Sequence, residues 1–369
     1  MQIPLFETED FYGRYEFSSP YLLSVSDCES VTIGELLELG GKSLEAFART
    51  KLHYTDSRGE PALRELIARG YESVSPGEVL ELNAPIEGIF ITMSALLDPG
   101  DRAVVLGPCY DALRNLPEHV SGNVALWMLE PNEGGWSLDL ERLDQLLAPP
   151  TKLLVVNFPH NPTGFLPTPE QWSELIDRAR QRGVWLFSDE MYRGLELGGR
   201  EALPSAADLY DKSVVLSGLS KSFGLPGLRF GWLVVRDETL REDLLNWKYY
   251  TSICPPAPSE QLAMAALEAR DTLVAQNRAR VERNLALAEP FFERFVSFFD
   301  WRAPQAGPVA LVGIDVPSAR AHCDALAKDA GIVLLPGSFL GFGDRHVRFG
   351  FGRDGFAEAL ARYEQQLSP

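Results

Sequence analysis

Five polar residues of this sequence follow apolar runs, and their types suit the binding of a small charged ligand. They are Asn161, Asp189, Tyr192, Lys221 and Arg229. A buried carboxylate can hold a proton on a ligand nitrogen, an amine can bond covalently to a carbonyl group, and a guanidinium can grip a phosphate. Each residue alone has an ordinary structural explanation, such as a turn, a helix cap or a surface charge. Their occurrence in order along the chain predicts one shared ligand site.

The apolar runs before these residues have the length and composition of buried strands. Four runs are bounded by turn residues, at 103–106, 153–156, 184–187 and 214–216. Continuous apolar runs are typical of parallel strands that are covered on both faces. The carboxyl ends of such strands share one edge of the sheet, where open α/β folds bind their ligands. We therefore expect the polar residues to meet at that edge.

The segment between the second and third runs predicts a helix with both ends marked. Thr168 is an N-cap, Pro169 occupies the first helical position, Gln171 completes a capping box, and Gly183 ends the helix. Between them, apolar residues recur on one helical face: Trp172, Leu175, Ile176 and Ala179. Strand, helix and strand in this order form a βαβ unit, which joins parallel strands.

We expect an α/β fold with a large domain and a smaller one. The large domain, residues 46–258, would hold a mostly parallel sheet flanked by helices. The smaller α+β domain would combine residues 1–45 and 259–369, with the prolines at 255–258 as the hinge. Its expected strands lie at 309–312, 332–335 and 347–349, and its expected helices at 318–330 and 356–367.

Composition and charge narrow the possible partners and compartment. The chain has 369 residues, 45% of them hydrophobic, and a formal net charge of −18. This charge disfavours nucleic acid and anionic membranes as partners. No apolar run approaches the length of a membrane span, and residues 1–15 do not resemble a signal peptide. The four cysteines form no C-x-x-C pair, so we expect free thiols in a reducing cytoplasm.

Two other ligand classes find little support. Residues 350–355 fit G-x-G-x-x-G, but too few residues follow to complete a dinucleotide-binding fold. No two of the five histidines show the spacing of metal ligands, so no metal site is predicted.

The ordered residues resemble the class I/II aminotransferase family, whose members are pyridoxal-phosphate (PLP) enzymes of fold type I. The resemblance covers nearly the whole chain. Residues 53–64 resemble a Y-x4-G-x3-L-R segment, residues 96–101 match an L-L-x-P-G-D turn, and Tyr110 follows a proline as the family's aromatic residue does. Residues 347–351 resemble the strand that carries the substrate-binding arginine, here Arg348. The resemblance implies a transaminase of amino acid metabolism, acting on an amino acid and a 2-keto acid.

The resemblance also implies the roles of the catalytic residues. Lys221 would bind PLP covalently and move the substrate proton as general base and acid. Asp189 would keep the ring nitrogen protonated, while Tyr192 and Asn161 would hydrogen-bond the ring hydroxyl oxygen. Arg348 would form a fork with the substrate α-carboxylate, and Asn161 would also bind the substrate.

Four further residues would hold the cofactor. Tyr110 would stack on its ring, and Arg229 and Ser220 would bind its phosphate. Tyr54 would reach the phosphate of the other subunit, which implies a homodimer.

Three segments depart from the usual pattern of the family. Residues 83–87 (NAPIE) replace a phosphate-binding segment rich in glycine and hydroxyl groups, and Gly218 stands where a hydroxyl is common. Residues 24–28 replace a glycine segment that touches substrate. These departures leave the substrate and the reaction subtype open.

Two alternatives keep PLP but change the outcome. Residues 250–260 resemble the capreomycidine synthases, PLP enzymes that cyclise an arginine derivative, so a lyase or cyclase acting on an amino acid side chain is the first. The second is a non-catalytic PLP-binding sensor module of a transcription regulator. Such modules accompany a basic DNA-binding domain, which this acidic sequence disfavours.

Overall fold

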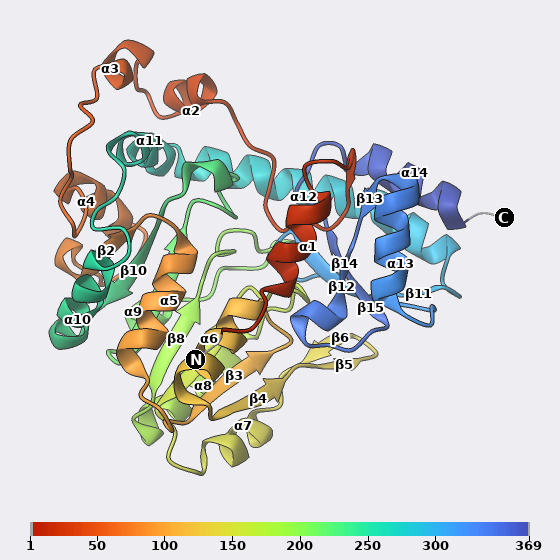
Figure 1. Ribbon diagram of the computed structural model, residues 1–369, viewed down its shortest axis with the longest axis horizontal. Helices are drawn as coiled ribbons and strands as arrows, with labels where there is room; N and C mark the ends of the chain where they lie inside the picture. The colour runs from red at the N-terminus through yellow and green to blue at the C-terminus, as the bar shows by residue number, and fades with distance from the viewer. Residues whose placement is uncertain (1–2, 368–369) are drawn as a thin grey trace.

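A seven-stranded sheet forms the centre of the larger part of the molecule. In the computed structural model, which describes residues 3–367, the strands run in the order β2-β10-β9-β8-β7-β3-β4 (Figure 1). Their bounds are β2 (Val79–Leu82), β3 (Ala103–Gly107), β4 (Val124–Met128), β7 (Leu153–Asn157), β8 (Trp185–Asp189), β9 (Ser213–Gly218) and β10 (Gly231–Val235). Strand β10 is antiparallel to both β2 and β9, and every other adjacent pair is parallel. The four predicted strands are β3, β7, β8 and β9, and the mostly parallel sheet is confirmed.

Helices cover both faces of this sheet. Successive side chains of each strand point to opposite faces and so pack into two different hydrophobic cores. Val104 and Val215 face one core, whereas Val105 and Val214 face the other. The second core is closed by α5 (Pro85–Leu96), α6 (Asp111–Ser121) and α10 (Glu238–Tyr249). The first is closed by α2 (Ile33–Leu39), α4 (Pro61–Ala68), α7 (Leu140–Leu147), α8 (Pro169–Arg182), α9 (Ala206–Leu209) and α11 (Ala257–Glu268). This layered arrangement confirms the predicted α/β fold class.

Helix α8 is the element that the sequence specifies most fully. The Thr168 side chain accepts from the Gln171 N–H, the reciprocal half of the capping box is present, and Gly183 adopts φ +65°. The four apolar residues of its predicted face are buried. Local end signals and one apolar face therefore fix this helix.

A second, antiparallel sheet organises the smaller part of the molecule. Its order is β11-β12-β15-β14, and α1 and the C-terminal helices pack around it (Figure 1). The bounds here are α1 (Glu7–Tyr15), β11 (Phe299–Asp300), β12 (Val309–Ile314), α13 (Ala319–Ala325), β14 (Leu335–Pro336), β15 (His346–Gly350) and α14 (Phe356–Leu367). Residues 326–330 continue α13 as a π-helical turn, so the two expected C-terminal helices are present.

The expected strand at 332–335 is wrong as a single strand. Residues Ile332–Val333 form β13 and pair with β1 (Tyr21–Leu22), whereas β14 pairs with β15. The apolar run is divided because its two halves find different partners. The remaining short elements are α3 (Leu44–Ala48), η1 (Pro76–Glu78), β5 (Glu130–Asn132), β6 (Gly135–Ser137), η2 (Pro226–Leu228) and η4 (Gly337–Leu340).

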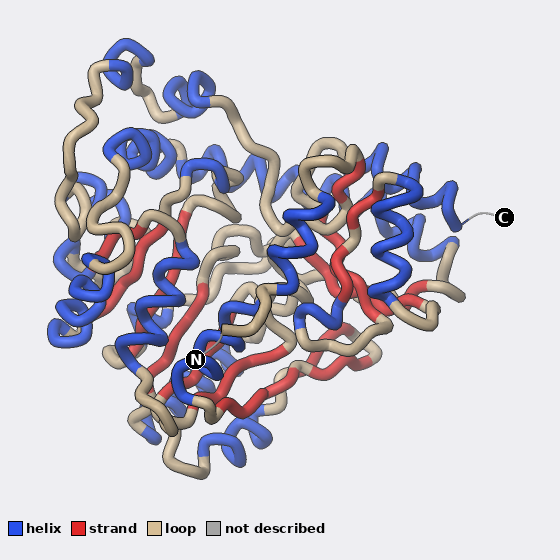
Figure 2. The backbone as a smooth tube through the Cα atoms, viewed as in Figure 1, coloured by secondary structure: helices blue, strands red, loops and turns tan. Residues whose placement is uncertain are grey.

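One long helix, α12 (Arg270–Arg294), joins the two parts (Figure 2). Its residue Leu273 belongs to the core on the large sheet, and Val281 belongs to the core of the smaller part. Helices α2 and α11 also pack on the large-sheet side. The domain division at 45/46 and 258/259 stays a prediction, and these contacts favour boundaries before α2 and inside α12.

Within residues 3–367, no helix is long and apolar enough to cross a membrane. All four cysteines are free, and three of them are buried.

Candidate active site

A cavity of about 400 Å³ opens at the carboxyl ends of β7, β8 and β9. Every predicted site residue except Tyr54 contributes to its lining: Tyr110, Asn161, Asp189, Tyr192, Ser220, Lys221, Arg229 and Arg348. Arg348 reaches the cavity from β15, so both parts of the molecule form its walls. The expectation that the polar residues meet at this sheet edge is confirmed as geometry.

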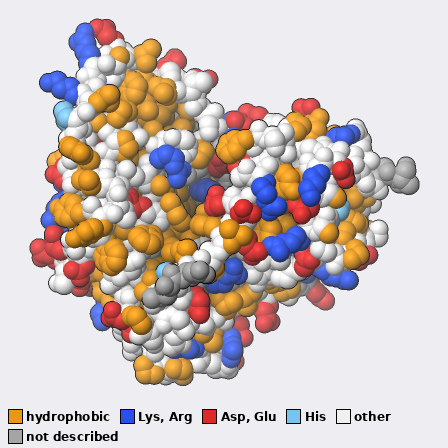
Figure 3. Space-filling view, viewed as in Figure 1, with side chains coloured by type: hydrophobic (Ala, Val, Ile, Leu, Met, Phe, Trp, Pro, Cys, Tyr) orange, Lys and Arg blue, Asp and Glu red, His pale blue; other side chains and the backbone are white. Residues whose placement is uncertain are grey.

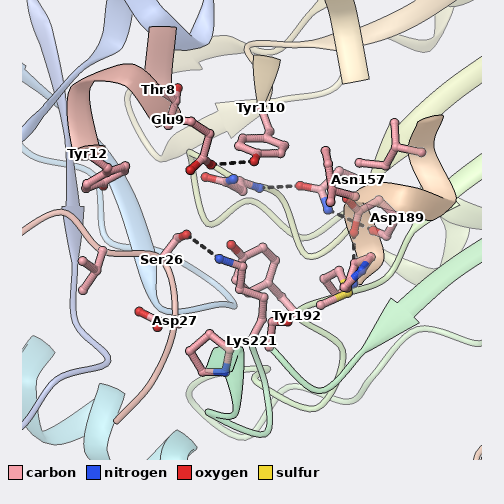
Figure 4. Close-up of a pocket in the computed structure, with 18 of the residues that line it drawn as sticks. Thr8, Glu9, Tyr12, Ser26, Asp27, Tyr110, Asn157, Asp189, Tyr192 and Lys221 are labelled. Carbon is pink, nitrogen blue, oxygen red and sulfur yellow. Dashed lines mark hydrogen bonds between the residues drawn. The ribbon is translucent and has the colours of Figure 1, made fainter. Parts of the chain in front are cut away.

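Lys221 places its amine inside this cavity (Figure 4). Its Nζ donates to the Ser26 hydroxyl oxygen at 2.8 Å. Burial lowers the pKa of Lys221, although Asp27 opposes that effect. A lowered pKa increases the share of neutral amine, which is the form that can attack a carbonyl group or accept a proton.

Asp189 is a buried carboxylate at the end of β8. Its Oδ1 accepts from the Met191 N–H at 3.1 Å, and Asn157 donates to its backbone carbonyl at 2.9 Å. Burial raises the pKa of Asp189 to about 7, and the Met191 hydrogen bond and Lys221 lower it only in part. A protonated nitrogen placed against this side chain would favour its ionised form.

Two buried hydroxyl groups on the cavity wall lack partners among the described residues. They belong to Tyr192, which is 3% exposed, and Ser220, which is 6% exposed. Buried polar groups are normally hydrogen-bonded. These hydroxyls could therefore bind polar atoms of a cofactor in the cavity.

Arg348 is 1% exposed and is held in place by several acceptors. Its Nη1 donates to Asn161 Oδ1 at 3.0 Å, and its Nη2 donates to the Tyr12 hydroxyl at 2.9 Å. Nε and Nη2 also donate to the Ser24 carbonyl oxygen, at 3.2 and 2.9 Å. A guanidinium fixed in this way presents a preorganised cation to a carboxylate.

Tyr110 and Arg229 lie at other positions on the cavity wall. The Tyr110 hydroxyl donates to Glu9 Oε1 at 2.7 Å (Figure 4), and burial raises the pKa of this tyrosine. Arg229 is exposed, has a φ of 52°, and donates to the Pro226 carbonyl oxygen at 2.7 Å. Its guanidinium therefore remains accessible to an anion.

Comparison with known proteins identifies the family of this chain. The profile described as "Aminotransferase class I and II" matches residues 33–362. The chain belongs to the aminotransferase class I and II family. The predicted family and the fold of its PLP-dependent members are thus confirmed.

The relatives of this aminotransferase-family protein include an aminotransferase as well as enzymes named as a synthase and a cyclase. Capreomycidine synthase of Streptomyces vinaceus is 29% identical, over 99% of this chain and 94% of its own. A PLP-dependent aminotransferase from Streptococcus suis aligns with a TM-score of 0.91 and 30% identity, over 100% of this chain and 97% of its own. The PLP-dependent cyclase OrfR aligns with a TM-score of 0.90 and 25% identity, over 100% and 99%.

The structure does not bring Tyr54 to this cavity of the aminotransferase-family fold. Tyr54 is 82% exposed, in the segment between α3 and α4. Its predicted role concerns the other subunit, and that role stays a prediction.

Helix α5 begins at Pro85, within residues 83–87, the segment that replaces the usual phosphate-binding segment of the family. Pro85 is the first helical residue and has no N–H, and the Glu87 N–H donates to the Ala84 carbonyl oxygen at 3.0 Å. The Pro85 ring packs over two glycines, because a Cβ added at Gly218 or Gly231 would lie 2.9 Å from Pro85 Cγ. The departures at Pro85 and Gly218 are therefore physically linked.

Sequence reasoning missed the contribution of α1 to this active site. Thr8, Glu9, Tyr12 and Glu16 line the cavity, and Figure 4 shows the first three extending from α1. Phe11, Tyr12 and Tyr15 are a weak sign of an amphipathic helix. Contact with the cavity depends on how α1 docks, which has no local signal. Residues 24–28, recognised as an unusual segment, contribute Ser26 and Asp27.

Proposed function

We propose that the protein moves the amino group of an amino acid to a 2-keto acid, with Lys221 as the residue that binds the cofactor. The protein is a transaminase of the class I and II family, and its cofactor is PLP. The observation that carries the proposed roles is the convergence of an amine, a buried carboxylate and a fixed guanidinium on one cavity: Lys221, Asp189 and Arg348.

The cavity residues fit PLP. The unpartnered hydroxyls of Tyr192 and Ser220 match its ring oxygen and its phosphate as hydrogen-bond partners. Arg229, which remains accessible, would pair with the phosphate. Asp189 would hold the proton on the ring nitrogen, and Tyr110 would cover the ring. When bound, PLP withdraws electrons from the substrate α-carbon and so weakens its C–H bond.

The chain's own residues would then orient the substrate and move its proton. Arg348, supported by Asn161 and Tyr12, would bind the α-carboxylate and fix the position of the α-carbon. Lys221, whose pKa burial lowers, would accept the α-proton as general base and could donate it again as general acid. Water would supply the keto oxygen, so that the amino acid leaves as a 2-keto acid while PLP would supply the group that retains the amino nitrogen.

A lyase or cyclase reaction is the second candidate. The 29% identity to capreomycidine synthase over 99% of the chain and the TM-score of 0.90 to a PLP-dependent cyclase favour it. In this case the same residues would remove the α-proton, and the side chain would lose a leaving group. The two functions differ in their products, since only transamination gives stoichiometric keto acid without ammonia.

We also propose that the protein is a cytoplasmic homodimer. Hydrophobic side chains gather over α2 and α3 (Figure 3), and Ile33, Leu44, Leu52 and Tyr54 are at least 49% exposed. Exposed apolar patches mark interaction surfaces. Four free cysteines suit a reducing compartment.

Two measurements test the proposal. Borohydride reduction of the holoenzyme, followed by peptide mapping, is expected to find the cofactor on Lys221, and Lys221→Ala is expected to lose the covalent label and all turnover. Screening amino acids against the holoenzyme with product identification is expected to give keto acids. Label on another lysine would overturn the site assignment, and a cyclic or ammonia-releasing product would establish the second candidate.

A further inference from the structure

The cavity wall carries more charged side chains than the proposed reaction uses. The proposed roles account for Lys221, Asp189, Arg229 and Arg348. Three acids remain on the wall: Glu9, Glu16 and Asp27. Asp27 pairs with Arg353 at 2.8 Å, which offsets its charge. Glu9 and Glu16 are therefore surplus carboxylates in the space left for a substrate.

Glu9 lies on the cavity face of α1, and Glu16 is the C-cap residue that directly follows this helix. Glu9, Tyr12 and Glu16 are spaced by three and four residues, which places them on one side of a helix. Thr8 fixes the start of this helix, since its N–H and hydroxyl donate to Asp111 at 3.2 and 3.0 Å. The Tyr12 hydroxyl donates to the Ser24 carbonyl oxygen at 2.7 Å and accepts from Arg348. The face that carries the acids is thus held against the arginine that would bind the α-carboxylate.

The distances along α1 suit an amino acid with an extended side chain. With a rise of 1.5 Å per residue, Glu9 and Glu16 lie roughly 5 and 6 Å along the helix from Tyr12. A substrate whose α-carboxylate contacts Arg348 is next to Tyr12. The far end of a long side chain can therefore reach one of the acids on either side.

The electrostatic state of Glu16 favours a cation there. Burial raises the pKa of Glu16, and the neighbouring Asp27 raises it further, while Arg353 and Lys221 lower it only in part. No described residue forms a hydrogen bond or ion pair with its carboxylate, and Glu16 caps the carbonyl end of α1. Helix C-termini carry partial negative charge. A guanidinium or ammonium group of a substrate would lessen the repulsion among these carboxylates and give Glu16 a direct ion pair.

We propose that the substrate of this active site is an amino acid with a cationic side chain, selected by Glu16 and Glu9 on α1. The inference rests on the proposed amino acid chemistry at Lys221 and adds the substrate class to it. Glu9 keeps one oxygen for the substrate, because Tyr110 donates to the other at 2.7 Å. Glu16 is the stronger determinant, because it is more buried and lacks a partner.

The test compares amino acids of similar reach and different charge. The amino-transfer half-reaction of the holoenzyme is measured with L-arginine, L-lysine, L-norleucine and L-glutamate. The wild type is expected to favour a cationic substrate over norleucine by roughly 100-fold in kcat/KM, as for a well-placed charge pair. Glu16→Gln is expected to lower this ratio about 10-fold through KM, and Glu16→Lys to shift preference toward glutamate. Glu9→Gln should add a smaller loss.

The control is Asp10→Asn, which removes an acid from the same helix. Asp10 pairs with Arg14 on the exposed side, so the ratio should stay at the wild-type value. A wild type that prefers norleucine or glutamate would overturn the substrate class, as would a Glu16→Gln variant that loses the same factor with every substrate. Failure of the proposed function gives a different result: no amino acid reacts, and Lys221 carries no label.

Discussion

At the scale of single residues, the environment of Asp189 determines what this carboxylate can do. Burial raises the pKa of Asp189 to about 7, so at neutral pH the group is partly protonated before any positive partner arrives. A pyridinium nitrogen against it would lower that pKa again. An asparagine at this position would have the same shape and would still accept from the Met191 N–H. It has no negative charge with which to stabilise a protonated ring nitrogen.

Asp189→Asn is therefore expected to fold normally and to lose activity. The loss in kcat should be roughly 100-fold or more, since a preorganised charge is removed from the reacting ring. Three measurements separate the effects: alkaline release gives the cofactor content, circular dichroism reports folding, and the half-reaction rate gives the activity. A variant with full cofactor and near-normal turnover would reduce Asp189 to a structural acceptor for the Met191 N–H.

At the scale of elements, a buried charge cluster fastens the loop that carries Tyr54. Lys248 of α10 is fully buried and donates to the Ser57 carbonyl oxygen at 2.5 Å. Glu81 of β2 and Glu260 of α11 lie in the same cluster, 0% and 3% exposed. Gly59 crosses directly over Glu81, where a Cβ would lie 2.1 Å from the carboxyl carbon. The loop is thus tied to α10 through Ser57 and to β2 through Gly59.

This cluster predicts a specific pH dependence of stability. Burial raises the pKa of Glu260 from 4.5 to about 7, so the folded state holds this proton more tightly than the unfolded state. Its stabilising contribution is complete below about pH 4.5 and is lost as the pH rises toward 7. Glu260→Gln should remove that decline, on the order of 3 kcal/mol in the free energy of unfolding. Urea denaturation at about pH 5 and about pH 8 measures the difference.

The matched control for this prediction lies on the same helix. Glu268 is an exposed acid of α11 that pairs with Lys42 at 3.4 Å. Glu268→Gln should follow the wild-type profile, because a surface pair contributes little. Parallel profiles for Glu260→Gln and the wild type would show that Glu260 titrates as an ordinary carboxyl group.

The elements also show how far sequence reasoning reaches. Helix α8 could be predicted because its caps and its apolar face lie within the helix itself. The division of the run 332–335 into two strands could not be predicted, because each half pairs with a distant strand. Its first half pairs with β1, near the start of the chain, and its second half pairs with β15, more than ten residues further on. The strand-end residues of the site could be predicted because they follow apolar runs whose carboxyl ends share one edge of a parallel sheet. The contribution of α1 could not, because it depends on tertiary docking.

At the scale of the whole molecule, the exposed arm around α3 requires an explanation. Leu52 and Tyr54 are more than 80% exposed in one chain, which is costly for an isolated surface. In the proposed homodimer this arm would be covered, and each Tyr54 would complete the partner's site. The active unit would then be the pair of chains.

Hybrid dimers test this arrangement directly. Lys221→Ala and Tyr54→Ala chains, each of low activity alone, are co-expressed with different tags, and the mixed dimer is purified. If Tyr54 acts across the interface, the hybrid contains one complete site and should regain about half of the wild-type activity. Sedimentation equilibrium confirms that each variant remains dimeric. A hybrid as inactive as its parents would place Tyr54 in its own subunit's site, and full activity of the Tyr54→Ala homodimer would remove it from the site altogether.

The packing of Pro85 against Gly218 also constrains the order in which this site could have evolved. A side chain at position 218 would lie 2.9 Å both from Pro85 Cγ and from the Phe230 carbonyl oxygen. A lineage with a hydroxyl at 218 must therefore lose it before proline is accepted at 85. The reverse path must lose the proline first and shift β10 as well. Both paths share one intermediate, glycine at 218 without proline at 85, so the effects of substitutions at these two positions are expected to be epistatic.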